Sequence, residues 1–208
     1  MKLIVGPTLL NSFDWCKECP PSWSEKALED LTNTIKRKPF VATPEAEKGI
    51  EFETILQRIC ERGAHPAQGS GNFLKIVEAC KGGMWQVWRD YFFSYENMPV
   101  RCFNKIDVLM RDRIIDIKTT GKYKGPAQYA KGWQPITMFL ATDKPLFEFI
   151  IAEWESKDSK RIGAVHNVFV HKTGEEHARL LQQFGEFMEF LKTKNLYDAY
   201  LTIYCKNK

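Results

Sequence analysis

The chain has 208 residues, of which 44% are hydrophobic and 13% aromatic, and this composition predicts a folded protein and excludes a disordered one. Its length fits a single domain with a full hydrophobic core. The formal net charge of +4 is only mildly basic, so the charge of the whole chain is weak evidence for a nucleic-acid partner.

The cysteine pattern and the first residues of the chain indicate the cellular compartment in which we expect the protein. Cys16 and Cys19 form one C-x-x-C pair, but no second pair stands at a zinc-like spacing, so we expect neither a zinc site nor a disulfide framework. Gly6 and Pro7 interrupt the first apolar residues too early for a secretory signal, and no run of 18 apolar residues exists. We therefore expect a cytoplasmic protein that has reduced thiols and no membrane contact.

Helical and strand patterns follow one another along the chain. They predict, in order, helices at 24–37 and from 44 onward, a Gly-rich break at 63–71, a short helix at 73–80, a strand at 85–94, a turn at 97–99, strands at 101–110 and 113–119, a helical segment at 126–141, strands at 146–155 and 163–171, and a helix at 175–192. This order predicts an α/β fold with a mixed central β-sheet flanked by helices. We expect one domain over residues 1–208, with a helical N-terminal segment at about 1–40.

The helix that starts at Pro44 carries a candidate acidic residue. Thr43 is a suitable N-cap and Pro44 a suitable first helical residue. The apolar stripe of this helix consists of Phe52, Ile55, Leu56, Ile59 and Cys60. Glu53 lies at the edge of the stripe, whereas Glu51 falls on the solvent side. We therefore expect Glu53, and not Glu51, to reach a functional site; the alternative is that Glu53 is an ordinary surface acid.

Two further acids lie in the strands at 101–110 and 113–119. A two-residue loop at Arg111 and Asp112 pairs Met110 with Arg113, and counting back along both strands places Asp107 opposite Asp116. Directly opposed residues have Cβ atoms about 4.5–5.5 Å apart, and like charges there destabilise a sheet unless a positive charge lies between them. Lys118 projects on the same side as Asp116, since side chains alternate along a strand.

Three carboxylates and one lysine suit an oxygen-ligated cation such as Mg²⁺ or Mn²⁺. Such a cation polarises a phosphodiester and lowers the pKa of a bound water, while Lys118 orients or deprotonates the nucleophile or stabilises the developing charge. The expected reaction is metal-dependent phosphodiester hydrolysis. The alternative for Asp107, Asp116 and Lys118 is an ordinary solvated face of a hairpin.

A basic and aromatic stretch follows Lys118. Lys122, Lys124 and Lys131 occur there without an acidic residue, interleaved with Tyr123 and Tyr129. Lysines can hold a phosphate backbone and an aromatic ring can stack on an unpaired base, so Lys122, Tyr123, Lys124 and Lys131 are candidates for DNA binding. The alternative is a solvated loop.

The order of these motifs resembles the PD-(D/E)XK nuclease superfamily, in its RecB-like and phage-type (lambda-exonuclease-like) branch. The segments concerned are G-I-E-F-E at 49–53, K-I-D at 105–107, I-I-D-I-K-T-T at 114–120 and Gln134, and the N-terminal PTLLNSFDWCKECP is similar to the segment that opens many members. The resemblance implies a restriction-endonuclease-like core. It implies that Glu53, Asp107, Asp116 and the Ile117 carbonyl hold the metal, that Lys118 is the catalytic lysine, and that Gln134 contacts DNA.

Two positions depart from the pattern, and Gln134 has a second interpretation. Met138 stands where the family has the tyrosine of its Gln-x-x-x-Tyr motif, which puts a tyrosine contact to DNA in doubt. Cys205 is the single cysteine near the end of the chain, so we do not expect the iron–sulfur cluster of some members. Gln134 could also simply begin a helix, because Pro135 follows it.

The resemblance implies a metal-dependent DNA exonuclease that acts in phage-type recombination, replication or repair. Members of this kind often work with a single-strand annealing protein, and some form ring-like homo-oligomers. Two alternatives remain open: a structure-specific endonuclease with the same core, and a DNA-binding protein with a silent site.

Overall fold

The computed structural model describes residues 2–62 and 71–206. Its centre is a six-stranded mixed sheet made of β1 (Leu3–Val5), β2 (Met84–Tyr95), β3 (Met98–Leu109), β4 (Arg113–Thr120), β5 (Leu146–Trp154) and β6 (Ile162–His171). The strand order is β1-β3-β4-β5-β6, with β2 paired to β3. The β1–β3 and β4–β5 pairs are parallel, and the other pairs are antiparallel.

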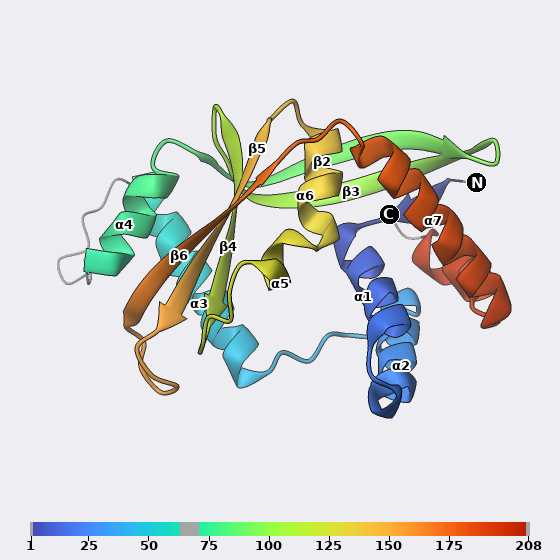
Figure 1. Cartoon of the computed structure of the whole chain (residues 1–208), viewed down its shortest axis with the longest axis horizontal. Coiled ribbons are helices and arrows are strands. Elements are labelled where there is room, and N and C mark those ends of the chain that lie inside the picture. The colour runs from blue at the N-terminus through green and yellow to red at the C-terminus, as the bar shows by residue number, and fades with distance from the viewer. Residues whose placement is uncertain (1, 63–70, 207–208) are drawn as a thin grey trace.

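Helices cover the sheet on both faces (Figure 1). They are α1 (Pro7–Glu18), α2 (Ser24–Ile35), α3 (Pro44–Arg62), α4 (Gly71–Cys80), α5 (Ala127–Ala130), α6 (Trp133–Ala141), α7 (Glu176–Thr193) and α8 (Tyr197–Ala199), with a 3₁₀ turn at Pro21–Trp23 and a π-helical turn at Tyr200–Tyr204. This architecture confirms the expected α/β class with a mixed central sheet flanked by helices.

Three hydrophobic clusters hold these layers together. The first joins β1 and parts of β2 and β3 to α1, α2, α7 and the C-terminal turns. The second packs α3 and α4 against β4, β5 and β6, and includes Ile115 and Ile117. The third packs α6 against β3, β4 and β5, and includes Ile114 and Phe149. Because Ile114 and Ile115 belong to different clusters, β4 is buried on both faces.

Several boundaries differ from the sequence-based expectation. The strand β3 already begins at Met98, and the turn before it consists of Glu96 and Asn97, which have φ values of 47° and 62°. Pro99, expected in the turn, lies inside β3 opposite Ser94. Ile55, expected in the apolar stripe of α3, has 42% of its surface exposed. The three-residue β1 was not expected, and the predicted break at 63–71 lies outside the described residues except for Gly71, which begins α4.

Within residues 2–62 and 71–206, none of the helices combines the length and the apolar composition that are needed to cross a membrane.

Candidate active site

The β3–β4 hairpin has the expected register, and it opens at the two acidic residues. Met110 N donates a hydrogen bond to Arg113 O at 2.9 Å, and the ladder continues with the pairs Leu109–Ile114 and Val108–Ile115. The next pair in this register would be Asp107 and Asp116, but the ladder ends before it. Instead, Ile117 N donates a hydrogen bond to Oδ2 of Asp107 at 3.0 Å. A carboxylate therefore replaces a backbone carbonyl at the point where the strands separate.

The β2–β3 ladder is also interrupted at Asp107. Trp85 pairs with Val108 and Val87 pairs with Ile106, but the pair between them, Gln86 and Asp107, is missing. Gln86 has φ +52°, which is uncommon for a residue with a side chain. The irregularity changes which face the strand presents, because Trp85 packs with the α3–α4 cluster and Val87 with the α6 cluster. Asp107 thus lies at a break in both neighbouring ladders.

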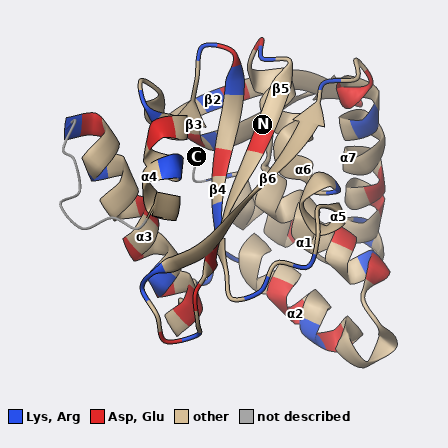
Figure 2. Cartoon of the chain, turned by 60° about the vertical axis from the view of Figure 1, so that its left-hand side comes forward, with Lys and Arg blue, Asp and Glu red and all other residues tan. Residues whose placement is uncertain are grey.

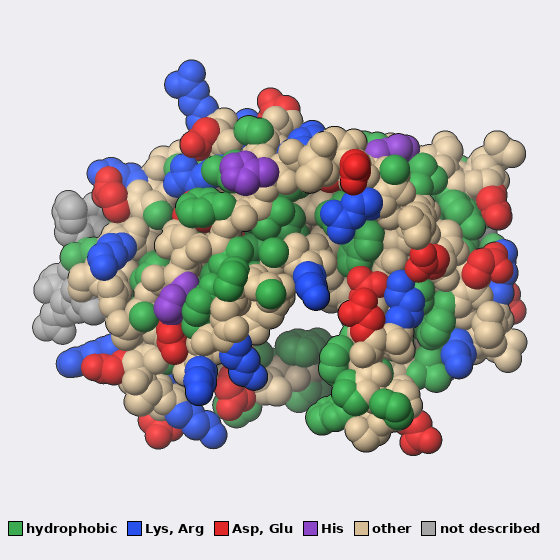
Figure 3. All heavy atoms as spheres, in the orientation of Figure 1, with side chains coloured by type: hydrophobic (Ala, Val, Ile, Leu, Met, Phe, Trp, Pro, Cys, Tyr) green, Lys and Arg blue, Asp and Glu red, His purple; other side chains and the backbone are tan. Residues whose placement is uncertain are grey.

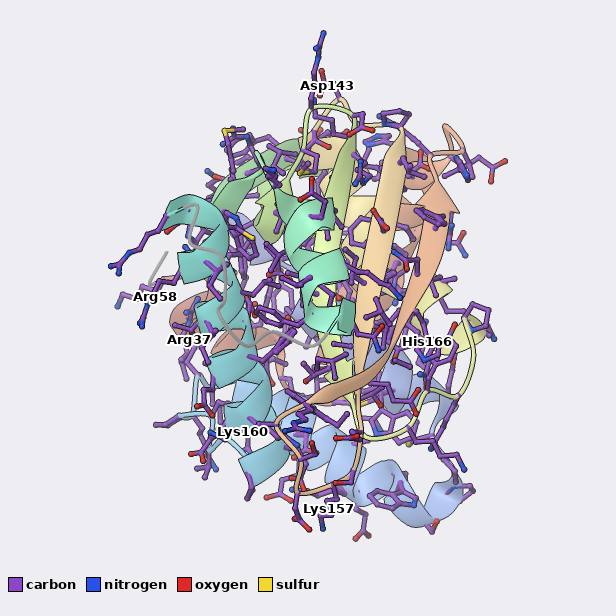
Figure 4. All side chains as sticks on the ribbon, turned by 90° about the vertical axis from the view of Figure 1, so that its left-hand side faces the viewer. Arg37, Arg58, Asp143, Lys157, Lys160 and His166 are labelled. Carbon is purple, nitrogen blue, oxygen red and sulfur yellow. The ribbon has the colours of Figure 1, made fainter. Side chains whose placement is uncertain are left out.

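The helix α3 supplies Glu53 from the other side. The Oγ1 of Thr43 accepts a hydrogen bond from Ala46 N at 3.2 Å, which confirms the expected N-cap. Glu53 is partly buried and accepts a hydrogen bond from Nε2 of Gln86. Glu51 is exposed and forms an ion pair at 2.8 Å with Lys160, which Figure 4 labels beside α3. Glu53 therefore faces the sheet and Glu51 faces solvent, as the helical periodicity predicts.

A glycine lets α3 approach the end of β4. A Cβ atom added at Gly49 would lie 2.9 Å from Oγ1 of Thr119. The first turns of α3 consequently sit close to the segment that carries Lys118, and a hollow between them is lined by Glu53, Ile117 and Lys118 among others.

A connected group of side chains lies at the fork, the point where β3 and β4 separate at Asp107 and Asp116. It consists of Asp116, Lys118 and Gln134. Asp116 is only 2% exposed; its Oδ2 lies 2.5 Å from Nζ of Lys118, and its Oδ1 accepts a hydrogen bond from Nε2 of Gln134 at 2.8 Å. Gln134 comes from the first turn of α6 and so ties this helix to β4. Basic and acidic positions occur together along β4 in Figure 2.

The electrostatics of the site reflect crowded negative charge. The pKa of the Asp107 carboxyl is raised to about 7, first by burial and then by the negative charges of Asp116 and Glu53. Burial alone would lower the pKa of Lys118, but Asp116 and Asp107 outweigh it, so the pKa of this ammonium group lies above its ordinary value. Lys118 is thus positively charged at neutral pH.

The donor set fits a divalent cation, although the side chains are not gathered around one point. In the described part of the chain no three His, Cys, Asp or Glu side chains are arranged to hold one metal ion. Glu53 and Asp116 are engaged by Gln86 and Lys118 instead. Three carboxylates together with a backbone carbonyl are nevertheless the ligand chemistry that Mg²⁺ and Mn²⁺ prefer.

Hollows on the surface lead to Lys118 from the N-terminal helices. One, of about 470 Å³, is lined by Thr8, Asn11, Ser12, Trp15, Ala27, Asp30, Lys118 and Gln134. Another is lined by residues that include Trp15, Lys118, Tyr129, Lys131 and Gln134. Figure 3 shows the surface deeply hollowed in this region, between α5, α1 and α3. Asp116, Lys118 and Gln134 therefore stand beside a cleft that solvent can enter.

The remaining DNA-binding candidates occupy different surroundings. Lys131 lines the cleft with Gln134, whereas Lys122 and Lys124 are exposed on the loop between β4 and α5. The ring of Tyr123 is stacked between His166, with ring centroids 4.0 Å apart, and Tyr129, at 6.0 Å. Base stacking on Tyr123 remains a prediction, and it would require this stack to open.

Three further observations concern residues that the sequence left open or missed. Cys16 and Cys19 are free thiols. Met138, which departs from the family pattern, is 1% exposed and belongs to the α6 cluster. Gln86 was not expected at the site, and no motif identifies it, because its role depends on a positive φ and on a hydrogen-bond partner from helix α3.

Comparison by sequence finds no matching protein family and no matching curated protein. Comparison by structure finds an alkaline exonuclease, LHK-Exo from Laribacter hongkongensis, at 14% identity and a TM-score of 0.52, over 91% of this chain and 88% of that one. The same enzyme in complex with dAMP matches at 15% identity, with the same TM-score and coverage. The structure of SSO0001 matches at 12% identity and a TM-score of 0.54, over 90% of this chain and 76% of that one. The chain therefore shares the fold of these solved structures, an alkaline exonuclease among them.

Proposed function

We propose that this chain is a metal-dependent deoxyribonuclease that hydrolyses phosphodiester bonds from DNA ends. The observation that supports the proposal best is the fork between β3 and β4, where Asp107, Asp116 and Lys118 come together next to Glu53. The fold shared with solved exonucleases is consistent with it. A role in phage-type recombination, replication or repair, alongside a single-strand annealing protein, belongs to the same proposal.

In this proposal Glu53, Asp107, Asp116 and the carbonyl of Ile117 hold Mg²⁺ or Mn²⁺. The bound metal supplies polarisation of the phosphodiester and an activated water. Lys118, whose raised pKa keeps it protonated, stabilises negative charge on the phosphate in the transition state. Gln134 holds one oxygen of Asp116 and so fixes the direction in which the other oxygen points. Lys122, Lys124 and Lys131 contact the DNA backbone.

The test is digestion of end-labelled linear DNA beside closed circular DNA, with Mg²⁺, Mn²⁺ or EDTA. We expect metal-dependent loss of linear DNA only, and a loss of activity of about 100-fold or more in Lys118→Ala and in Asp116→Asn. Lys160→Ala and Asp112→Asn change exposed residues of the same types and serve as matched controls. Cleavage of the circles would favour a structure-specific endonuclease. DNA binding without cleavage would favour a protein with a silent site.

The role of Glu53 can be tested against Glu51, which lies in the same helix α3. Glu53→Gln removes the charge that faces the fork, and we expect it to lower the rate by about tenfold or more. Glu51→Gln, two residues away on the solvent side, should leave the rate within about twofold of the wild type. Equal effects of the two substitutions would remove Glu53 from the proposed site.

A further inference from the structure

The hairpin of β2 and β3 has one buried and one open face. Tyr91 and Phe93 point toward α7, where Tyr91 contacts His177 and Phe93 packs on Phe184. The other face carries the alternate residues. In the ladder, these are the cross-strand pairs Trp88–Lys105, Asp90–Phe103 and Phe92–Arg101. Helices α6 and α7 lie on the opposite side of this hairpin (Figure 1).

Large aromatic rings are exposed on this open face. Trp88 is 56% exposed and Phe92 is 57% exposed. The ring of Phe103 lies beside Trp88, with centroids 6.5 Å apart, so the two rings form one surface. Contiguous exposed apolar surface of this kind commonly marks a binding site.

The charges around these rings are mainly positive. The Nζ of Lys2 lies 4.3 Å from the centre of the Phe92 ring, and Lys105 is exposed beside Trp88. The acid of this face, Asp90, is neutralised by Arg101 at 2.8 Å. Within residues 2–62 and 71–206, Lys2 and Lys105 form no ion pair with an acidic residue, and exposed aromatic rings beside such cations suit a ligand that has flat apolar bases and a polyanionic backbone.

The open face lies next to the candidate active site along both strands. Gln86, which holds Glu53, is two residues before Trp88 on β2, and Asp107 is two residues after Lys105 on β3. Two residues along a strand span about 6–7 Å, which is close to the spacing of successive nucleotides in an extended strand. A DNA strand that lies along the hairpin over Trp88 and Phe92 would therefore extend toward Gln86 and Asp107.

We propose that the face formed by Lys2, Trp88, Phe92, Arg101, Phe103 and Lys105, the aromatic platform, binds an unpaired DNA strand. Bases stack on Trp88 and Phe92, while Lys2 and Lys105 neutralise phosphates. The direction of the strand toward Asp107 rests on the proposed nuclease function, but binding to the platform does not require catalysis.

The test is fluorescence anisotropy of a labelled oligo-dT of about 20 nucleotides, in EDTA, with the full chain. We expect the double variant Trp88→Ala/Phe92→Ala to bind about tenfold or more weakly, because each lost stack weakens binding substantially. Trp88→Phe keeps a ring and should retain most of the affinity. Phe169→Ala removes another exposed aromatic, 53% exposed on β6, and should bind as the wild type does. Lys2→Ala/Lys105→Ala should reduce the salt dependence of binding.

Other outcomes would overturn the platform. If the double variant binds the oligonucleotide with wild-type affinity, the platform proposal is rejected. The nuclease proposal is unaffected by this result, provided that the chain cleaves DNA. Light scattering that shows a dimer in the wild type and a monomer in the double variant would assign the face to a second copy of this chain. Weakened binding in the double variant of a chain that cleaves nothing would support the platform and count against the nuclease.

Discussion

Asp107 occupies a position that is unfavourable without a bound cation. Its carboxylate stands where two ladders are interrupted, close to Asp116 and Glu53, and its pKa is raised to about 7. The hydrogen bond from Ile117 N compensates only in part, since burial and like charge outweigh it. A carboxyl group with such a raised pKa is typical of functional sites, and this supports the proposed role of Asp107.

The substitution Asp107→Asn should stabilise the protein in EDTA. A carboxyl whose pKa is raised in the folded state destabilises that state when ionised, so stability should fall as the pH rises from about 4 to 7 and stay low above it. Asparagine keeps an oxygen for Ile117 N but carries no charge. We expect a gain of about 1 kcal/mol or more at pH 8 and little change near pH 4, measured by urea unfolding.

Asp112→Asn, in the exposed hairpin turn, is the control for this experiment. It should leave the pH dependence of unfolding unchanged. A clear loss of stability in Asp107→Asn at pH 8 would show that the ionised carboxylate is favourable in the metal-free fold, and the crowding of charges at the fork would be rejected.

At the scale of elements, local patterns predicted the longer helices and strands but not their irregularities or the short strand β1. The register of β3 and β4 followed from the two-residue loop at Arg111 and Asp112, and the periodicity of α3 separated Glu53 from Glu51. The missing Gln86–Asp107 pair could not be predicted, because a positive φ at a glutamine has no signal in the local sequence. The sequence of β2 shows no Gly or Pro that would indicate such a break.

The break in β2 predicts that glycine at position 86 gives a more stable protein than alanine does. Gln86→Gly and Gln86→Ala both remove the hydrogen bond to Glu53, but only glycine adopts φ +52° without strain. We expect Gln86→Gly to be more stable than Gln86→Ala by about 1 kcal/mol in chemical unfolding. Both variants should lower nuclease activity, since Glu53 loses the group that positions it.

Arg89 provides the comparison, because it lies in the same strand with regular pairing to Asn104. There the usual order should hold, with alanine more stable than glycine by about 0.5–1 kcal/mol. If alanine is also the more stable residue at position 86, the left-handed conformation of Gln86 is wrong.

At the scale of the whole molecule, the candidate active site depends on contacts between distant segments. Asp14 of α1 accepts a hydrogen bond from Nε1 of Trp133 at 2.5 Å and another from Gln183 of α7, partners that are 119 and 169 residues away in the chain. Asn11, also of α1, accepts a hydrogen bond from Trp133 N at 2.9 Å and so caps α6. These contacts fix the first turn of α6, which carries Gln134, the residue that donates a hydrogen bond to Asp116. No local pattern predicts them, because the partners meet only after the sheet has formed.

Asp14→Ala should therefore lower both the stability of the fold and the nuclease activity. It leaves the Trp133 and Gln183 donors without their acceptor and removes the ion pair with Lys17, so we expect a loss of about 1–3 kcal/mol in urea unfolding. Glu189→Ala removes an exposed helical ion pair with Lys192 and should cost less than about 0.5 kcal/mol. Because α6 carries Gln134, nuclease activity measured well below the melting temperature should also fall in Asp14→Ala but not in Glu189→Ala. A destabilised Asp14→Ala variant with full activity would show that Gln134 does not depend on the contact between α1 and α6.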